Sequence, residues 1–215
     1  MSASEFQQRK SEDGHDRPLP CKVILASASP RRRDLLSMAG ISFEVSVSDS
    51  EEITTETEPG KIVEALSGQK ARAVCEMLPE GERAVILGAD TIVVLDGRVL
   101  GKPKDRAEAK VMITALQGKA HSVYTGVTLI RKDTGKIESF YSETRVSVRA
   151  MSEDEVDAYI STNEPYDKAG GYGVQGKFGA FIDRIEGDYA TVVGLPLCRV
   201  CQKLKEMAGI SIFQK

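Results

Sequence analysis

The spacing of apolar and polar residues alternates along the chain between the two-residue period of strands and the longer period of helices. Apolar or alternating runs predict strands over residues 24–26, 42–48, 84–95, 122–130, 137–148 and 178–185. Helical periodicity and start signals predict helices that begin near Pro30, Pro59, Asp105, Ser152 and Leu195. Short turns join several of the strands as hairpins, which favours a mixed sheet. The expected fold class is α/β: an elongated, twisted mixed sheet flanked by helices, with two lobes around a cleft.

Residues 27–33 carry three arginines at the start of a predicted helix. Ser29 is a good N-cap, and Pro30 suits the first helical position, where its missing N–H costs nothing. Cations at a helix N-terminus oppose the helix dipole, whereas an anion is stabilised there by free backbone N–H groups. A solvated basic surface is the alternative explanation. Because an apolar strand directly precedes the turn, we favour a polyphosphate or nucleotide site over residues 27–33.

Asp90 places one carboxylate inside an otherwise apolar predicted strand. A charge in such a position is costly unless it is paired, hydrogen-bonded or bound to a metal. A structural aspartate that caps neighbouring amides is the alternative. We favour a functional role, either as a ligand for a divalent metal or as a general base toward water.

Two lysines and a glycine-rich segment add further candidates for a ligand site. Taken alone, a lysine such as Lys70 or Lys102 is most often a surface residue, but the two together with the arginines could neutralise a triphosphate. Residues 167–176 contain glycines that permit close approach of the backbone to a ligand. Within them, Gln175 offers both a donor and an acceptor for the edge of a nucleobase. A flexible linker is the alternative for this segment.

The bulk properties of the chain restrict its partners. A length of 215 residues favours one domain, and a net charge of −3 implies no general surface for nucleic acid. No apolar run reaches the roughly 20 residues of a membrane span. Residues 1–20 are polar and lack the features of a secretory signal, so we expect a disordered tail followed by one domain over 21–215. The four cysteines form no zinc pattern and fit a reducing, cytoplasmic location.

Five motifs together resemble the Maf family of nucleoside triphosphate pyrophosphatases. In chain order they are SASPRR (27–32), GADT (88–91), GKP (101–103), EPYDKAGGYGVQG (164–176) and VGLPL (193–197). The resemblance implies the two-lobed α/β fold shared with inosine triphosphate pyrophosphatases. It also implies hydrolysis of a nucleoside triphosphate to the monophosphate and pyrophosphate, with Mg²⁺ or Mn²⁺ as the cofactor.

The resemblance further assigns expected roles to individual residues. Asp90 matches the proton acceptor of the family, and it would also contact the metal together with Glu44. The positions associated with substrate choice are Arg31, Thr91 and Gln175. The positions associated with phosphate binding are Ser27, Arg32, Lys70 and Lys102.

The glycine-rich tract over residues 168–175 resembles the branch of the family that prefers dTTP and UTP, rather than the branch that prefers 7-methyl-GTP. We therefore expect a house-cleaning enzyme that acts on dTTP, UTP and modified pyrimidine triphosphates, and the family suggests a homodimer. Two alternatives stay open. One is a non-catalytic, nucleotide-binding regulator of cell division, because the family is also associated with inhibition of septum formation. The other is a pyrophosphatase for purine substrates such as ITP or 7-methyl-GTP.

Overall fold

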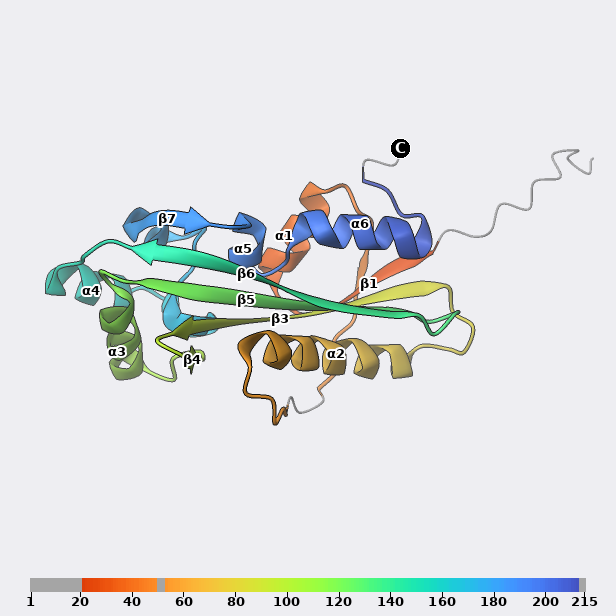
Figure 1. The fold of residues 1–215 in the computed structure, drawn as a ribbon, viewed down its shortest axis with the longest axis horizontal. Helices are drawn as coiled ribbons and strands as arrows, with labels where there is room; N and C mark the ends of the chain where they lie inside the picture. Colours follow the sequence, from red (N-terminus) through yellow and green to blue (C-terminus); the bar gives the residue numbers. More distant parts are fainter. Residues whose placement is uncertain (1–20, 50–52, 213–215) are drawn as a thin grey trace, which may run out of the picture.

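A computed structural model describes residues 21–49 and 53–212, so the tail expected over residues 1–20 lies outside the described residues. Figure 1 shows an elongated molecule built around one long sheet. The strands are β1 Lys22–Ala26, β2 Glu44–Val45, β3 Ala84–Leu95, β4 Arg98–Leu100, β5 Ala120–Arg131, β6 Ile137–Val148 and β7 Ile182–Glu186. The α-helices are α1 Pro30–Met38, α2 Pro59–Met77, α3 Arg106–Leu116, α4 Glu153–Ile160, α5 Tyr189–Val193 and α6 Leu197–Ala208.

The sheet is mixed, as the hairpin signals predict. Its strand order is β2-β1-β3-β5-β6-β7, with β4 paired to the far end of β3. Strand β1 is parallel to β2 and β3, whereas β3, β5, β6 and β7 follow one another as antiparallel neighbours. Three strands of 12 residues each, β3, β5 and β6, run the length of the molecule and connect its two ends.

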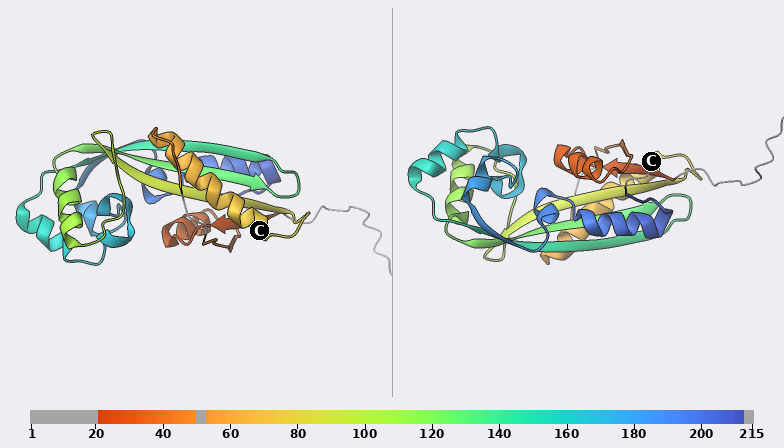
Figure 2. Two further views of the ribbon diagram at one scale, coloured as in Figure 1. Left: turned by 90° about the horizontal axis from the view of Figure 1, so that it is seen from below. Right: turned by 90° about the horizontal axis from the view of Figure 1, so that it is seen from above.

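Helices cover both faces of one half of the sheet. Figure 2 shows α2 across one face and α6 across the other. Alternate residues of β3 divide between these two layers: Leu87 packs in the core that contains Leu36 of α1 and Leu204 of α6, whereas Ile86 packs with Val74 of α2. The strands therefore carry continuous apolar runs in this half, as expected where both faces are buried.

The other half of the sheet forms a second lobe with α3 and α4. Its core contains Val93 and Val123 from the strands, Ile113 from α3, Tyr159 from α4 and the fully buried Phe178. The two cores meet along β3, which confirms the two-lobed architecture.

The sheet has a gap at the junction of the lobes. Strand β1 ends with Ala26 opposite Gly88, and β4 pairs with β3 only from Val93 onward. In the described part of the chain, residues 89–92 of β3 therefore have a strand neighbour on the β5 side alone. Ligands of open α/β sheets bind beyond the carboxyl end of a strand, and the end of β1 opens onto this gap.

Two glycines allow α2 to lie directly on the sheet. A Cβ at Gly88 would lie 2.2 Å from the backbone oxygen of Ser67, and one at Gly126 would lie 2.3 Å from the backbone of Val63. Both contacts are shorter than real Cβ atoms show, so a side chain at either position would push the helix outward. The closeness of α2 matters because this helix carries Lys70.

The expected elements differ from the observed ones in three places. The strand expected over 42–48 is only the two residues of β2. The strand expected over 178–185 is wrong in its first half, because residues Lys177–Phe181 form a 3₁₀ helix that buries Phe178, and β7 begins at Ile182. Helix α5 was not expected, and the closing helix α6 begins at Leu197. None of the described helices has the length and apolar character needed to cross a membrane.

Candidate active site

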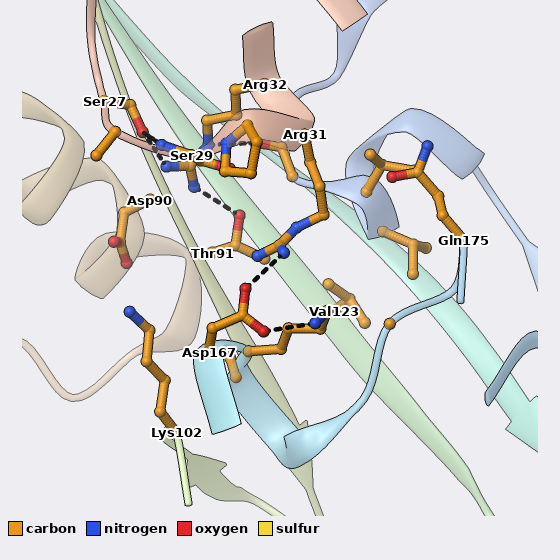
Figure 3. A pocket seen from close by; sticks show the side chains of 18 of the residues that line it. Ser27, Ser29, Arg31, Arg32, Asp90, Thr91, Lys102, Val123, Asp167 and Gln175 are labelled. Atoms are coloured by element: carbon orange, nitrogen blue, oxygen red, sulfur yellow. Dashed lines mark hydrogen bonds and ion pairs between the residues drawn. The ribbon is translucent and has the colours of Figure 1, made fainter. Parts of the chain in front are cut away.

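A cleft of about 440 Å³ opens at the gap in the sheet, between the two lobes. Its walls come from the β1–α1 turn, α2, the middle of β3, the glycine-rich segment and α5. Figure 3 shows how these side chains converge. The structure brings together all but one of the residues expected at the site: Ser27, Arg31, Arg32, Lys70, Asp90, Thr91, Lys102 and Gln175.

Glu44 is the exception. It lies on β2, with its side chain 67% exposed and a carboxylate oxygen 3.9 Å from Nζ of Lys22, and it is not among the residues that line the cleft. Over the described residues, no group of three or more histidine, cysteine, aspartate or glutamate side chains could hold a metal ion. The role of Glu44 near a metal therefore stays a prediction to which the geometry adds no support.

Asp90 and Lys70 form the most enclosed ion pair of the cleft. Nζ of Lys70 lies 2.6 Å from Oδ1 of Asp90, and the two side chains are 19% and 14% exposed. Asp90 belongs to the face of β3 that α2 covers, so helix and strand supply the two partners separately. The pairing offsets the cost of placing a carboxylate within an apolar strand.

Arg32 lies at the floor of the cleft and is only 8% exposed. Its Nε donates to the carbonyl of Gly194 at 2.8 Å, and its Nη1 and Nη2 donate to Oγ of Ser27 at 2.8 Å and Oγ1 of Thr91 at 3.0 Å. One guanidinium thus links β1, β3 and the residue after α5. Its positive charge lies under the site, but these bonds use N–H groups that could otherwise donate to a phosphate.

Arg31 and the loop on the far wall are joined across the cleft. Nη1 of Arg31 lies 3.0 Å from Oδ2 of Asp167, whose Oδ1 lies 2.5 Å from Nζ of Lys168. Burial alone would raise the pKa of the Asp167 carboxyl, but hydrogen bonds from Lys168 and Arg31 outweigh burial and hold its pKa below the ordinary value. Asp167 belongs to a motif that the sequence singled out, yet no role was expected for it.

The N-terminus of α1 opens onto the cleft, because residues 28–31 line it. Pro30 occupies the first helical turn as expected. Ser29 is the N-cap residue, but its side chain makes no capping hydrogen bond. A helix start with free backbone N–H groups is suited to an anion.

The glycine-rich segment is an ordered wall rather than a flexible linker. The carboxylate of Glu164 accepts hydrogen bonds from the backbone N–H of Lys177 at 2.8 Å and from the hydroxyl of Tyr159 at 3.1 Å. A Cβ at Gly176 would lie 2.4 Å from that carboxylate, so a side chain there would displace the carboxylate from these hydrogen bonds. The segment is thereby held in one conformation and presents Gln175, itself exposed, at the cleft.

A second buried contact supports the same wall. Nε2 of His121 lies 2.6 Å from the hydroxyl of Tyr172, and both side chains are buried. Burial lowers the pKa of His121 from 6.5 to about 4, so the imidazole is neutral at physiological pH. His121 is therefore a packing partner of the wall and does not face the ligand space.

Thr91 leads into a chain of buried hydroxyl groups that sequence reasoning missed. Oγ1 of Thr91 lies 2.9 Å from Oγ1 of Thr125, and Thr125 donates to the carbonyl of Thr191 at 2.8 Å. Thr125 and Thr191 are fully buried. A threonine within the apolar run of β5 is the signal that could have drawn attention to Thr125, but its partners could not be read from the chain.

The cleft has a charged end and a more apolar end. In Figure 3, Asp90 and Lys102 lie on one side of Thr91, and Gln175 lies on the other. The apolar part of the lining includes valines from β3, β5, the glycine-rich segment and α5: Val93, Val123, Val174, Val192 and Val193. This division is typical of a site for a charged group attached to a flat, partly apolar one.

Comparison of the sequence with known proteins identifies relatives of this chain. Residues 22–207 match the family model described as "Maf-like protein". The chain is 53% identical over 186 residues to a dTTP/UTP pyrophosphatase of Bacillus cytotoxicus. The aligned region covers 86% of this chain and 95% of the relative. It is 50% identical over 186 residues, with the same coverage, to a dTTP/UTP pyrophosphatase of Bacillus anthracis. The matched region contains every element that forms the cleft, and on these grounds the chain belongs to the Maf-like protein family.

Proposed function

We propose that this protein hydrolyses nucleoside triphosphates to the monophosphate and pyrophosphate, with dTTP and UTP as its preferred substrates. The observation that carries the proposal is the Lys70–Asp90 pair, because it places a carboxylate beside cationic groups in a cleft between two lobes. The names of the relatives, dTTP/UTP pyrophosphatases, support the choice of reaction and of substrate.

The charged end of the cleft suits the triphosphate. Lys70, Lys102 and Arg31 supply positive charge, and the start of α1 supplies backbone N–H groups. A triphosphate held there would present its α-phosphorus to the carboxylate of Asp90. Cations placed where negative charge develops stabilise the transition state more than the ground state.

Asp90 is the general base of the proposed reaction. It orients a water molecule and accepts its proton as the water oxygen bonds to the α-phosphorus and the bond from that phosphorus to the α–β bridging oxygen breaks. Pyrophosphate leaves with the electron pair of the broken bond. Lys70, at 2.6 Å, keeps the carboxylate in place and can follow the charge toward the leaving group.

The donor set fits Mg²⁺ or Mn²⁺ held mainly by the substrate. Such ions are commonly bound through one or two carboxylates together with phosphate oxygens and water, so Asp90 is sufficient as the protein ligand. When bound, the metal would offset negative charge on the phosphates. Removal of the metal with EDTA tests this requirement, since the proposal expects pyrophosphate release to stop.

The test of the function is release of pyrophosphate from dTTP, UTP, CTP, GTP, ITP and 7-methyl-GTP, each with Mg²⁺, Mn²⁺ or EDTA. The expected result is metal-dependent release that is fastest with dTTP or UTP. A preference for 7-methyl-GTP or ITP would refute the substrate assignment. Binding of nucleotide without release of pyrophosphate would refute the enzyme and favour the regulatory alternative.

A homodimer and a cytoplasmic location complete the proposal; the first rests on the family and the second on the four free cysteines. Light scattering coupled to size-exclusion chromatography tests the first. A mass equal to one chain at micromolar concentration would contradict it.

A further inference from the structure

The threonine chain beneath the cleft fixes the direction of each of its hydrogen bonds. Thr125 has one hydroxyl hydrogen, and this hydrogen is donated to the carbonyl of Thr191, which can only accept. In the 2.9 Å contact between Thr125 and Thr91, Thr125 must then be the acceptor. It follows that the single hydroxyl hydrogen of Thr91 is directed to Thr125, away from the cleft.

Arg32 completes the arrangement from the other side. A guanidinium donates and cannot accept, so its Nη2 at 3.0 Å occupies one lone pair of the Thr91 hydroxyl oxygen. Arg32 is itself held by Ser27 and by the carbonyl of Gly194. Thr91, which is only partly buried, therefore has one lone pair left for the cleft and no hydrogen to offer.

The position of Thr91 points to the nucleobase as the group that meets this lone pair. Thr91 pairs in register with Thr125, and Val93 pairs with Val123 one step further along the same face of the sheet. Val93 and Val123 both line the cleft, so Thr91 stands where the charged end gives way to the apolar end. A flat base against these valines would place one edge at Thr91.

We propose that Thr125 is a positioning residue that determines specificity by making Thr91 an obligate hydrogen-bond acceptor. An obligate acceptor selects a base with an N–H at the matching position, which is the imide N3–H of uracil and thymine. Cytosine has an unprotonated N3 there, and two lone pairs would face each other across the contact. The inference rests on the proposed function and adds the reason for its preference for uracil and thymine over cytosine.

The test compares UTP with CTP in the wild type and in variants of β5. Thr125→Val removes the fixed acceptor for the Thr91 hydrogen, so Thr91 can rotate and donate. We expect the ratio of kcat/KM for UTP over CTP to fall by roughly fivefold to tenfold, the size of one hydrogen bond. Thr125→Ser keeps the hydroxyl and should have the wild-type ratio of kcat/KM for UTP over CTP. Thr128→Val is the matched control, because Thr128 is a buried threonine of the same strand that contacts Ser67 and Ser139 instead.

Two further measurements separate this role from a merely structural one. With 3-methyl-UTP, which has no N3–H, Thr125→Val should leave kcat/KM unchanged. In a Thr91→Val background, Thr125→Val should have no further effect on the UTP to CTP ratio, because the two residues act through one hydroxyl. An unchanged ratio in Thr125→Val, or an equal loss with UTP and 3-methyl-UTP, would overturn the inference.

The Kd values for UTP and CTP provide the same ratio without catalysis. If the wild type releases no pyrophosphate, the proposed function fails, while the ratio of the two Kd values still decides the role of Thr125. A Thr125→Val variant with wild-type Kd values for both nucleotides would refute that role on its own.

Discussion

Replacing Gly88 with alanine should separate Lys70 from Asp90 without touching either residue. The new Cβ would lie 2.2 Å from the oxygen of Ser67, 2.8 Å from the nitrogen of Ala71 and 2.9 Å from the Cβ of Ala71. Two of these atoms belong to the backbone of α2, so no side-chain rotation can relieve the clash. Ordinary Cβ contacts begin at 3.4 Å, and the helix must therefore retreat by roughly 1 Å in a close-packed interior.

Two magnitudes follow from this displacement. Overpacking of a tight core destabilises the fold by about 1–3 kcal/mol. The pair that now measures 2.6 Å would lengthen beyond a good hydrogen bond, and a misplacement of roughly 1 Å at a reacting centre costs on the order of a hundredfold in rate. Gly88→Ala should thus lose roughly a hundredfold in activity even where it is fully folded, because the loss of stability is a separate effect of about 1–3 kcal/mol.

The assay is release of pyrophosphate from dTTP, run well below the Tm of each variant so that unfolding cannot account for the loss. Gly68→Ala is the control, since that glycine lies on α2 and its added Cβ meets the flexible end of Arg72 at 3.0 Å. We expect Gly68→Ala to keep its activity and to gain up to about 1 kcal/mol in stability from helix propensity. Wild-type kcat/KM in Gly88→Ala would refute the idea that close approach of α2 sets the catalytic pair.

Three other predictions concern single groups. Asp90→Asn should lower kcat by roughly 10²-fold to 10⁴-fold, as loss of a general base does, and circular dichroism should show that it is folded; near-normal kcat would remove Asp90 from the mechanism. Glu164→Gln should raise KM more than it lowers kcat, because the carboxylate orders the wall that presents Gln175; faster amide exchange over 173–178 would accompany the change, and wild-type exchange would contradict it. Burial lowers the pKa of His121 to about 4, so the unfolded state binds more protons between pH 6.5 and pH 4, and stability should fall as pH falls through that window. His121→Gln should flatten this part of the Tm profile, whereas a slope equal to that of the wild type would assign it to other groups.

The buried ion pair shows what the sequence can reveal about such a site. A carboxylate in the middle of an apolar strand is conspicuous, and Asp90 was identified for that reason. Its partner is harder to find, because nothing in the residues around Lys70 says that two glycines bring α2 close enough to the sheet. Lys70 entered the expected site as one of the cations that could neutralise a triphosphate, and the family resemblance assigned it to phosphate binding; neither predicted its pairing with Asp90.

The differences between the expected and the observed structure have equally specific causes. The apolar run that begins at Phe178 has the composition of a strand, but Phe178 is buried by a short 3₁₀ turn, and only the second half of the run joins the sheet. Glu44 was placed near the metal by resemblance, and the structure puts its side chain beside Lys22 on a two-residue strand at the sheet edge, so its role stays a prediction. The role argued for Thr125 depends on which oxygen donates, and that information exists only in distances.

The gap in the sheet opens one cleft to two neighbouring residues that the pleat of β3 places on opposite faces. Asp90 meets α2 on one face, and Thr91 meets Arg32 of α1 on the other. A closed sheet would have hidden both under covering helices, but the missing neighbour lets one cleft reach both faces. Mutations in the α2 layer should therefore alter the speed of the reaction, and mutations in the opposite layer its choice of base. Substrate preference could therefore change during evolution through residues on one face of the sheet, while Lys70 and Asp90 on the other face keep the same reaction.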